Sequence, residues 1–154
     1  DLEECVYMVK FRVIAETWNG VIMREKNTIE VLEKKYPLIT FKKVNGDMDA
    51  LYAVDYELYI KDTLICGLQI KPNTYRTSSN EAMKDSYKLN IEKNTLYTSR
   101  FNRPVLYAYS KTTGQILNPE VFNEIKAQID AYFLYRLFDY SLFNIDFDFK
   151  LILS

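Results

Sequence analysis

An aspartate followed fourteen residues later by a Gln-x-Lys motif is the feature of this chain best suited to hydrolytic chemistry. Asp55 lies within one apolar stretch, and Gln69 and Lys71 end the next. A carboxylate, an amide oxygen and a backbone carbonyl such as that of Ile70 are ligands of the kind that Mg²⁺ takes. A nearby lysine positions the attacking water or neutralises charge in the transition state. These residue types favour Mg²⁺-dependent cleavage of a phosphodiester.

Histidine is absent from the chain. Its absence excludes His-based triads, Cys–His nucleophiles and HExxH zinc sites. Any catalysis must therefore use carboxylates, lysine, tyrosine or a metal held by oxygen ligands.

Two β-prone stretches carry the motif, and residues 50–60 and 63–71 are predicted to form an antiparallel hairpin. Because side chains alternate along a strand, Gln69 and Lys71 share one face. A register that opposes Asp55 to Gln69 brings the three groups together, and it requires an odd number of loop residues. An even loop would separate Asp55 from Lys71. The alternative is a hairpin whose polar face is only solvated.

Glu25 is a further candidate metal ligand. It lies four residues from both Val21 and Ile29, on the apolar stripe of an expected helix. A carboxylate on a core-facing stripe is costly unless it has a partner such as a metal. The alternative is a boundary residue that reaches solvent. Glu16, on an earlier helix, is the weaker candidate.

The elements that position these groups are predicted from periodicity, caps and turn residues. Residues 45–47 are expected to form a turn, and the alternating residues 143–153 an edge or accessory strand. The remaining predictions are helices over 2–17 and 20–35 with a break at Asn19-Gly20, strands over 38–44, 50–60 and 63–71, a helix from Ser78 or Ser79 into the nineties, a strand over 105–109, and a helix from Pro119-Glu120 to about Leu137.

This order predicts an α/β (α+β) fold, in which helices flank a mixed central sheet in the order αβββαβ, followed by a C-terminal helix and tail. With 154 residues, we expect one domain. It would comprise helices over 2–35, the core sheet and helix over 38–110, and the C-terminal helix and tail over 115–154.

Composition favours a cytoplasmic protein with no membrane partner. No apolar stretch approaches the roughly 18 residues of a membrane-spanning helix, and the acidic first residues do not resemble a secretory signal. Cys5 and Cys66 lie among apolar neighbours and are expected to be buried thiols, with a disulfide as the less favoured alternative.

Basic residues are concentrated in the middle of a chain whose net charge is −1. Residues 69–111 contain eight Lys or Arg against three Asp or Glu, as expected where a polyanion binds. Candidate DNA contacts in this segment are Tyr75, Arg76, Lys84 and Lys88. The alternative is a solvated surface rich in lysine.

The runs Tyr52-Ala-Val-Asp55-Tyr-Glu and Cys66-Gly-Leu-Gln69-Ile-Lys71-Pro-x-x-Tyr75 resemble the MjaI restriction endonuclease family, a branch of the PD-(D/E)xK nucleases, over roughly residues 8 to 125. The resemblance implies a restriction-endonuclease-like core. It also implies Mg²⁺-dependent, sequence-specific (type II) cleavage of double-stranded DNA by a homodimer in a prokaryotic cytoplasm.

The same resemblance implies roles for individual residues. Asp55 matches the metal-binding aspartate, Lys71 matches the catalytic lysine, and Gln69 occupies the position usually held by Asp or Glu. Because an amide adds no charge, the site would depend more on Asp55 and Glu25.

Two other functions stay open: a repair or recombination nuclease on the same core, and a non-catalytic DNA- or protein-binding domain. The aromatic segment 132–149 is expected either to form a dimer interface or to be buried within the monomer.

Overall fold

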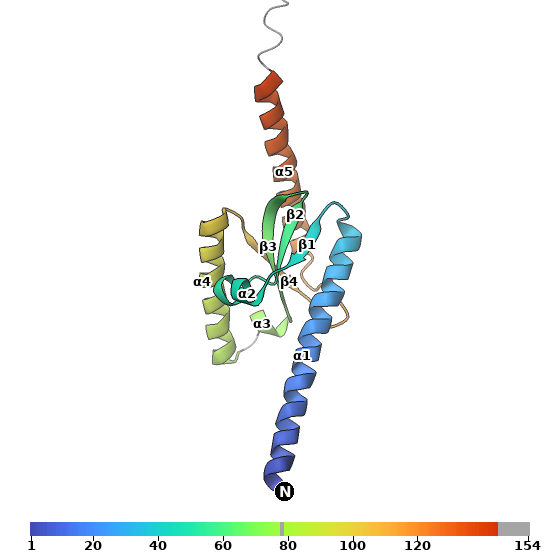
Figure 1. Ribbon diagram of the computed structural model, residues 1–154, viewed down its shortest axis with the longest axis vertical. Helices are drawn as coiled ribbons and strands as arrows, with labels where there is room; N and C mark the ends of the chain where they lie inside the picture. Colours follow the sequence, from blue (N-terminus) through green and yellow to red (C-terminus); the bar gives the residue numbers. More distant parts are fainter. Residues whose placement is uncertain (78, 145–154) are drawn as a thin grey trace, which may run out of the picture.

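The computed structural model describes residues 1–77 and 79–144, with side chains as far as residue 138. Its elements, shown in Figure 1, are α1 (Leu2–Lys35), β1 (Thr40–Lys43), α2 (Gly46–Tyr52), β2 (Tyr56–Ile60), β3 (Thr63–Lys71), α3 (Thr74–Thr77), α4 (Glu81–Phe101), β4 (Val105–Tyr109) and α5 (Glu120–Asn144). The predicted αβββαβ order with a C-terminal helix is confirmed. The short helices α2 and α3 were not predicted.

A mixed sheet in the order β1-β2-β3-β4 forms the centre of the fold. The first three strands are antiparallel, and β4 returns parallel to β3 after α4. Figure 1 shows α2 and α4 on one side of the sheet and α1 on the other. Leu32 of α1 and Ile125 of α5 pack with Leu58, Leu68 and Ala108 of the strands in the main core. The predicted α/β class, with a restriction-endonuclease-like arrangement, is therefore confirmed.

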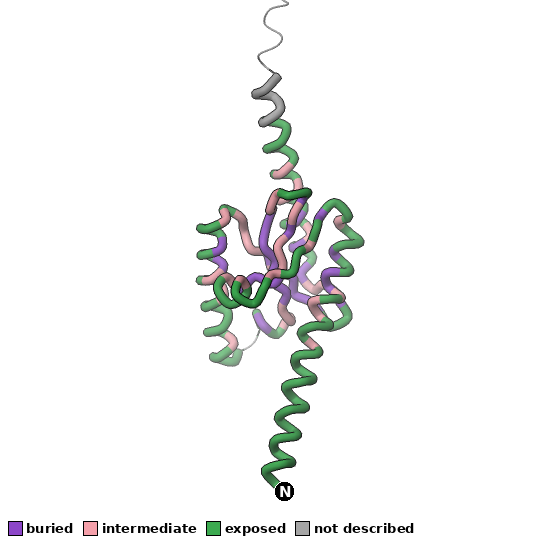
Figure 2. Tube along the Cα trace, in the orientation of Figure 1, coloured by how far each residue is buried: buried purple, intermediate pink, exposed green. Residues whose placement is uncertain are grey.

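Helix α1 is one continuous helix of 34 residues, so the predicted break at Asn19-Gly20 is wrong. A glycine inside a helix costs only about 1 kcal/mol, and the remainder of the 34-residue helix outweighs that cost. The first half of α1 extends away from the sheet and is exposed along its length (Figure 2). Cys5 lies on this half, so its predicted burial is also wrong; Cys66 is buried, and both thiols are free.

The segment before β2 is helical, in contrast to the predicted turn over 45–47 and strand from residue 50. The Asn45 side chain accepts a hydrogen bond from the Met48 N–H at 2.9 Å and caps α2. Asparagine suits a helix N-cap as well as a turn, and this ambiguity explains the error. Helix α2 ends at Tyr52 and is capped by Ala53, whose φ of 52° is left-handed, and β2 begins only at Tyr56.

A β-bulge sets the register of the β2–β3 hairpin. Ile60 pairs with Thr63 across a two-residue loop, which is the even loop expected to separate the polar groups. However, Tyr59 lies opposite Leu64 whereas Leu58 lies opposite Cys66, so one additional residue, Ile65, is inserted in β3. The insertion gives the register expected of an odd loop, in which Tyr56 lies opposite Leu68 and Asp55 comes directly before the paired residues.

The later helices differ from prediction at their ends. Asn80 caps α4, because its side chain accepts a hydrogen bond from the Ala82 N–H at 2.9 Å, so the helix begins at Glu81. Helix α5 continues past the predicted end near Leu137. Residues 143 and 144 of the predicted strand over 143–153 belong to α5, and its remainder, like Ser78, lies outside the described residues. None of the described helices has the length and apolar character needed to cross a membrane.

Two glycines test this fold, because an added methyl group meets open space at one and backbone at the other. A Cβ at Gly20 would have nothing within 4 Å, so Gly20→Ala should stabilise a continuous α1 by roughly 0.5–1 kcal/mol. Gly114 has φ +84°, and its Cβ would lie 2.5 Å from the Asn27 carbonyl oxygen. Gly114→Ala should therefore destabilise the protein by about 2 kcal/mol or more. Urea unfolding followed by circular dichroism measures both changes. Loss of stability in Gly20→Ala would contradict the uninterrupted helix.

Candidate active site

Asp55 lies at the open end of the hairpin, just before β2, with only 4% of its surface exposed. Its N–H donates to the Leu68 carbonyl at 3.0 Å. Its carboxylate accepts a hydrogen bond from the Ile70 N–H at 2.6 Å. The Lys71 ammonium lies 3.9 Å from the same carboxylate oxygen, Oδ2. The hairpin thus brings Asp55 and Lys71 together.

Gln69 adds an oxygen that has no partner. Its side chain is 1% exposed, and its Oε1 is buried without a hydrogen bond. A buried polar atom left in this state costs about 1–3 kcal/mol. The neighbouring Ile70 contributes a backbone carbonyl on the same side of β3 as its N–H, which faces Asp55. The end of the hairpin therefore presents a carboxylate, an amide oxygen and a carbonyl.

Glu25 approaches this site from α1, although its direct partner is a lysine. Its carboxylate is 16% exposed and forms an ion pair with Lys43 of β1. Its negative charge also raises the pKa of Asp55, so the two carboxylates lie within electrostatic range. Glu16, the weaker candidate, is exposed and bonded to Arg12 at 2.8 Å. It lies nine residues earlier, or about 14 Å along the helix axis.

Burial dominates the electrostatics of Asp55. Desolvation raises the pKa of its carboxyl group above the ordinary value, while the charge of Lys71 and the Ile70 N–H oppose this shift. Lys43 has a raised pKa in spite of its partial burial, because the hydrogen bond and charge of Glu25 favour the ammonium form. The site therefore holds a carboxylate that lacks full compensation for its negative charge.

These groups fit an oxygen-coordinated divalent cation. The Gln69 oxygen lacks a donor, and the Asp55 carboxylate would gain from a positive charge. Across residues 1–77 and 79–138, no three Asp, Glu or Cys side chains gather into a metal-binding cluster. A cation here would consequently depend on the neutral oxygens of Gln69 and Ile70 as well as on Asp55.

Asn94 of α4 is a supporting residue that the sequence did not reveal. It is buried, and its amide donates to the carbonyls of Tyr52 and Ala53 at 2.9 and 3.0 Å. The Tyr107 hydroxyl donates to its side-chain oxygen. These bonds hold the left-handed turn at Ala53, two residues before Asp55. The sequence pattern around an asparagine in a helix does not reveal a tertiary hydrogen-bond partner. The pattern around Lys43 likewise does not reveal its ion pair with Glu25.

The four predicted DNA contacts have different environments. Tyr75 is buried, and its hydroxyl bonds to Ser86 and Asn90 of α4, so its side chain supports α3 instead of lying free on the surface. Arg76 is exposed beside Glu120, with 3.7 Å between their charged atoms. Lys84, which pairs with Glu81, and Lys88 are exposed on α4.

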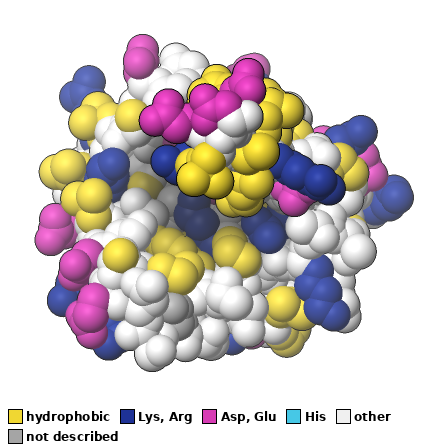
Figure 3. Space-filling view, turned by 90° about the horizontal axis from the view of Figure 1, so that it is seen from below, with side chains coloured by type: hydrophobic (Ala, Val, Ile, Leu, Met, Phe, Trp, Pro, Cys, Tyr) yellow, Lys and Arg dark blue, Asp and Glu magenta, His cyan; other side chains and the backbone are white. Residues whose placement is uncertain are grey.

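Viewed from the end of α1, the molecule has a hollow that contains Lys and Arg side chains, below the projecting helix, whose end shows both acidic and apolar side chains (Figure 3). A recess lined by basic groups attracts anions such as phosphates.

A mixed sheet with a carboxylate, a Gln-x-Lys segment and a return strand after a helix defines a restriction-endonuclease-like protein. The family model described as MjaI restriction endonuclease matches residues 1–127 of the 154-residue chain. The chain belongs to the MjaI restriction endonuclease family, which confirms the resemblance seen in the sequence. Membership makes it a nuclease of a restriction system, with DNA as its substrate. Searches of curated proteins and of solved structures found no match.

The raised pKa of Asp55 predicts that its charge destabilises the metal-free protein. A carboxyl group with a raised folded-state pKa stabilises the fold at low pH, and this contribution is lost as pH rises through the folded-state value. Asp55→Asn keeps an acceptor for the Ile70 N–H and removes the charge. We expect its melting temperature at neutral pH to rise by a few degrees, and the difference to narrow towards acid pH. Exposed Asp62→Asn is the control. A lower melting temperature for Asp55→Asn at pH 7 would refute this electrostatic account.

The Asn94 bonds predict a positioning role that can be separated from folding. Asn94→Ala should weaken Mg²⁺ binding by roughly tenfold or more, as measured by calorimetry, because Asp55 loses its support. Adding Ala53→Gly should restore part of the affinity, because glycine adopts the left-handed conformation without the Cβ penalty. Thr95→Ala, at an exposed position of the same helix, is the matched control. Unchanged affinity in Asn94→Ala would rule the role out.

Proposed function

We propose that this protein is a Mg²⁺-dependent type II restriction endonuclease, which hydrolyses phosphodiester bonds of double-stranded DNA at a specific sequence. It would act as a homodimer in the cytoplasm of a prokaryote. The observation that carries the proposal is the buried, unpartnered Gln69 oxygen on the strand whose end brings the Lys71 ammonium to the buried Asp55 carboxylate. Membership of the restriction endonuclease family supports it.

Asp55, Gln69 and the Ile70 carbonyl would hold the metal, with Glu25 adding negative charge nearby. Mg²⁺ bound there would supply positive charge for the transition state and make a bound water more acidic. Burial of Asp55 strengthens its attraction for a cation, because the surroundings screen charge less than water does. The Ile70 N–H fixes one carboxylate oxygen, which leaves the second for the metal.

Lys71 is suited to act on the substrate. Its side chain is 24% exposed, so the ammonium can reach a phosphate while it remains beside Asp55. It would donate a hydrogen bond to the attacking water or to a non-bridging phosphate oxygen, where negative charge develops. Its rigid position at the end of β3 fixes this donor relative to the metal ligands.

Arg76, Lys84 and Lys88 are the proposed contacts to the DNA backbone. The carboxylate partners of Arg76 and Lys84 are solvent-exposed, and such pairs contribute little free energy. A phosphate can therefore replace them at low cost. Tyr75 is left out of this set because its ring and hydroxyl already pack against α4.

Substitutions at the three motif positions distinguish metal binding by Asp55 and Gln69 from the action of Lys71 on the substrate. Asp55→Ala should lose both Mg²⁺ affinity and cleavage, because it removes the main anionic ligand. Lys71→Ala should keep most of the metal affinity, since an ammonium is not a ligand, but should lower cleavage by about 10²-fold or more. Calorimetry with Mg²⁺ and the appearance of discrete bands from mixed plasmid DNA are the two measurements, with exposed Lys111→Ala as the control.

Gln69→Glu is the most informative change at this site. It places a negative charge on the position of the unpartnered oxygen, so it should tighten Mg²⁺ binding and retain some cleavage. Unchanged metal affinity would show that Gln69 is not a ligand. A wild-type protein that gives no discrete bands with any plasmid would argue against the proposed activity itself.

A further inference from the structure

The exposed first half of α1, residues 2–19 (the free half), carries an apolar stripe that nothing in the described part of the chain covers. Tyr7, Phe11, Ile14 and Trp18 are 68%, 60%, 57% and 65% exposed. Their spacing of four, three and four residues places them on one side of the helix. Exposed apolar surface of this extent marks an interaction site.

The stripe continues the buried side of the same helix. The alternation of three and four residues runs from Trp18 through Val21 and Glu25 to Thr28 and Leu32, and the last two are fully buried. Such a repeat is the a/d pattern of a coiled coil. The second half of α1 buries this side against the body of the protein. The pattern indicates that a second helix covers the same side of the free half.

We propose that the occupant is a second copy of this chain, whose α1 packs antiparallel along the same stripe. This inference rests on the homodimer of the proposed function and identifies its interface. A symmetric pair of identical stripes closes on itself, as a two-fold dimer requires.

Charge selects the antiparallel orientation. Glu4 occupies the next stripe position before Tyr7, so a parallel pair would set Glu4 against its own copy in the apolar seam. An antiparallel pair centred between Phe11 and Ile14 sets Glu4 opposite Val21. It also brings the acidic first turn of one helix towards Arg24 and Lys26 of the other.

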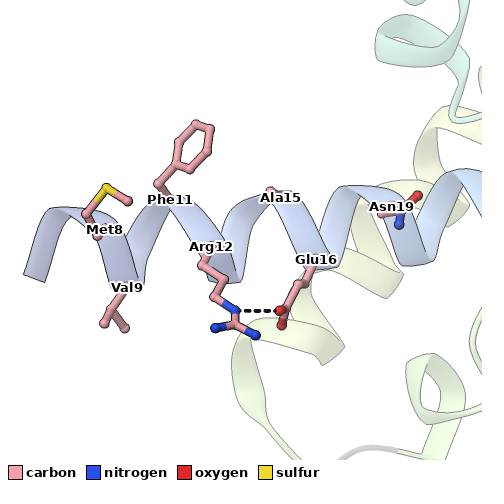
Figure 4. A pocket seen from close by; sticks show the side chains of 7 residues that line it. All are labelled: Met8, Val9, Phe11, Arg12, Ala15, Glu16 and Asn19. Carbon is pink, nitrogen blue, oxygen red and sulfur yellow. Dashed lines mark hydrogen bonds and ion pairs between the residues drawn. The ribbon is translucent and has the colours of Figure 1, made fainter. Parts of the chain in front are cut away.

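The area available is sufficient for a specific interface. Tyr7, Phe11 and Trp18 have side chains of about 200 Å² each, and most of that surface is exposed. With Ile14 and Ile22, the stripe offers on the order of 500 Å² per copy, or about 1,000 Å² for the pair, which meets the lower bound for a biological interface. Figure 4 shows Phe11 on one side of α1, with Val9 and the Arg12–Glu16 pair on the other, where they would stay in solvent.

Sedimentation equilibrium of the whole chain, without DNA or metal, tests the interface. The wild type should give twice the 18.2 kDa chain mass at micromolar concentration. Phe11→Glu and Trp18→Glu should each weaken the dimer at least tenfold. Val13→Glu is the matched control, because Val13 is 57% exposed on the same helix but off the stripe. A monomeric wild type, or a dimer that survives both stripe substitutions together, overturns the proposal. Sedimentation does not depend on cleavage. If the protein dimerises through this stripe but cuts no DNA, the proposed nuclease function is refuted and the proposed interface is not.

Spin labels on the native cysteine test the orientation. Cys5 is exposed, whereas Cys66 is buried and its pKa is raised to about 12, so Cys5 reacts selectively. In the antiparallel pair the two Cys5 residues are offset by about 22 Å along the helix axis. A parallel pair has no axial offset and leaves only the lateral separation of two outward-facing side chains, on the order of 15 Å. A short distance between labels would overturn the antiparallel arrangement.

Discussion

Burial of the Asp55 carboxylate is the constraint on which the structure of the site depends. A charge removed from water is costly unless donors or cations compensate for it. The Ile70 N–H and the Lys71 ammonium compensate in part, yet the pKa of Asp55 stays raised by desolvation. The side-chain oxygen of Gln69, the residue before Ile70, is also left without a donor. Both deficits would be relieved by the same ligand, an oxygen-seeking cation between them.

The rest of the fold holds this unfavourable arrangement in place. The bulge at Ile65 sets the register that places Tyr56 opposite Leu68, so that Asp55 lies at the end of β3. Gly67 allows α4 to pack closely on the sheet, because a Cβ there would lie 3.2 Å from both Tyr97 and Val54. Asn94 fixes the left-handed turn that leads into β2. Packing of the core thus compensates for the left-handed backbone at Ala53 and for the desolvated Asp55 carboxylate. Such local costs are common at functional sites.

The sequence predicted what depends on local pattern and missed what depends on partners. Strands β3 and β4 have the bounds expected from their apolar runs, and the αβββαβ order followed from element type alone. The bulge could not be predicted, because an inserted residue leaves no mark in an apolar strand. Helix α2 was missed because Asn45 suits a turn as well as a cap. Glu25 was placed near Asp55 from its position on the stripe of α1, but its ion pair with Lys43 depends on how the helix meets β1. Neighbours of this kind are set by tertiary packing.

We propose that Asp55, Gln69 and the Ile70 carbonyl form one cation site. A crystal structure of the protein soaked with Mn²⁺, with the metal located by its anomalous scattering, would reveal this site. We expect one strong peak between the Asp55 carboxylate and the Gln69 amide oxygen, with the Ile70 carbonyl as a third ligand and bond distances of about 2.1 Å. A peak bound elsewhere, or a Gln69 oxygen that only accepts a hydrogen bond from water, would contradict it.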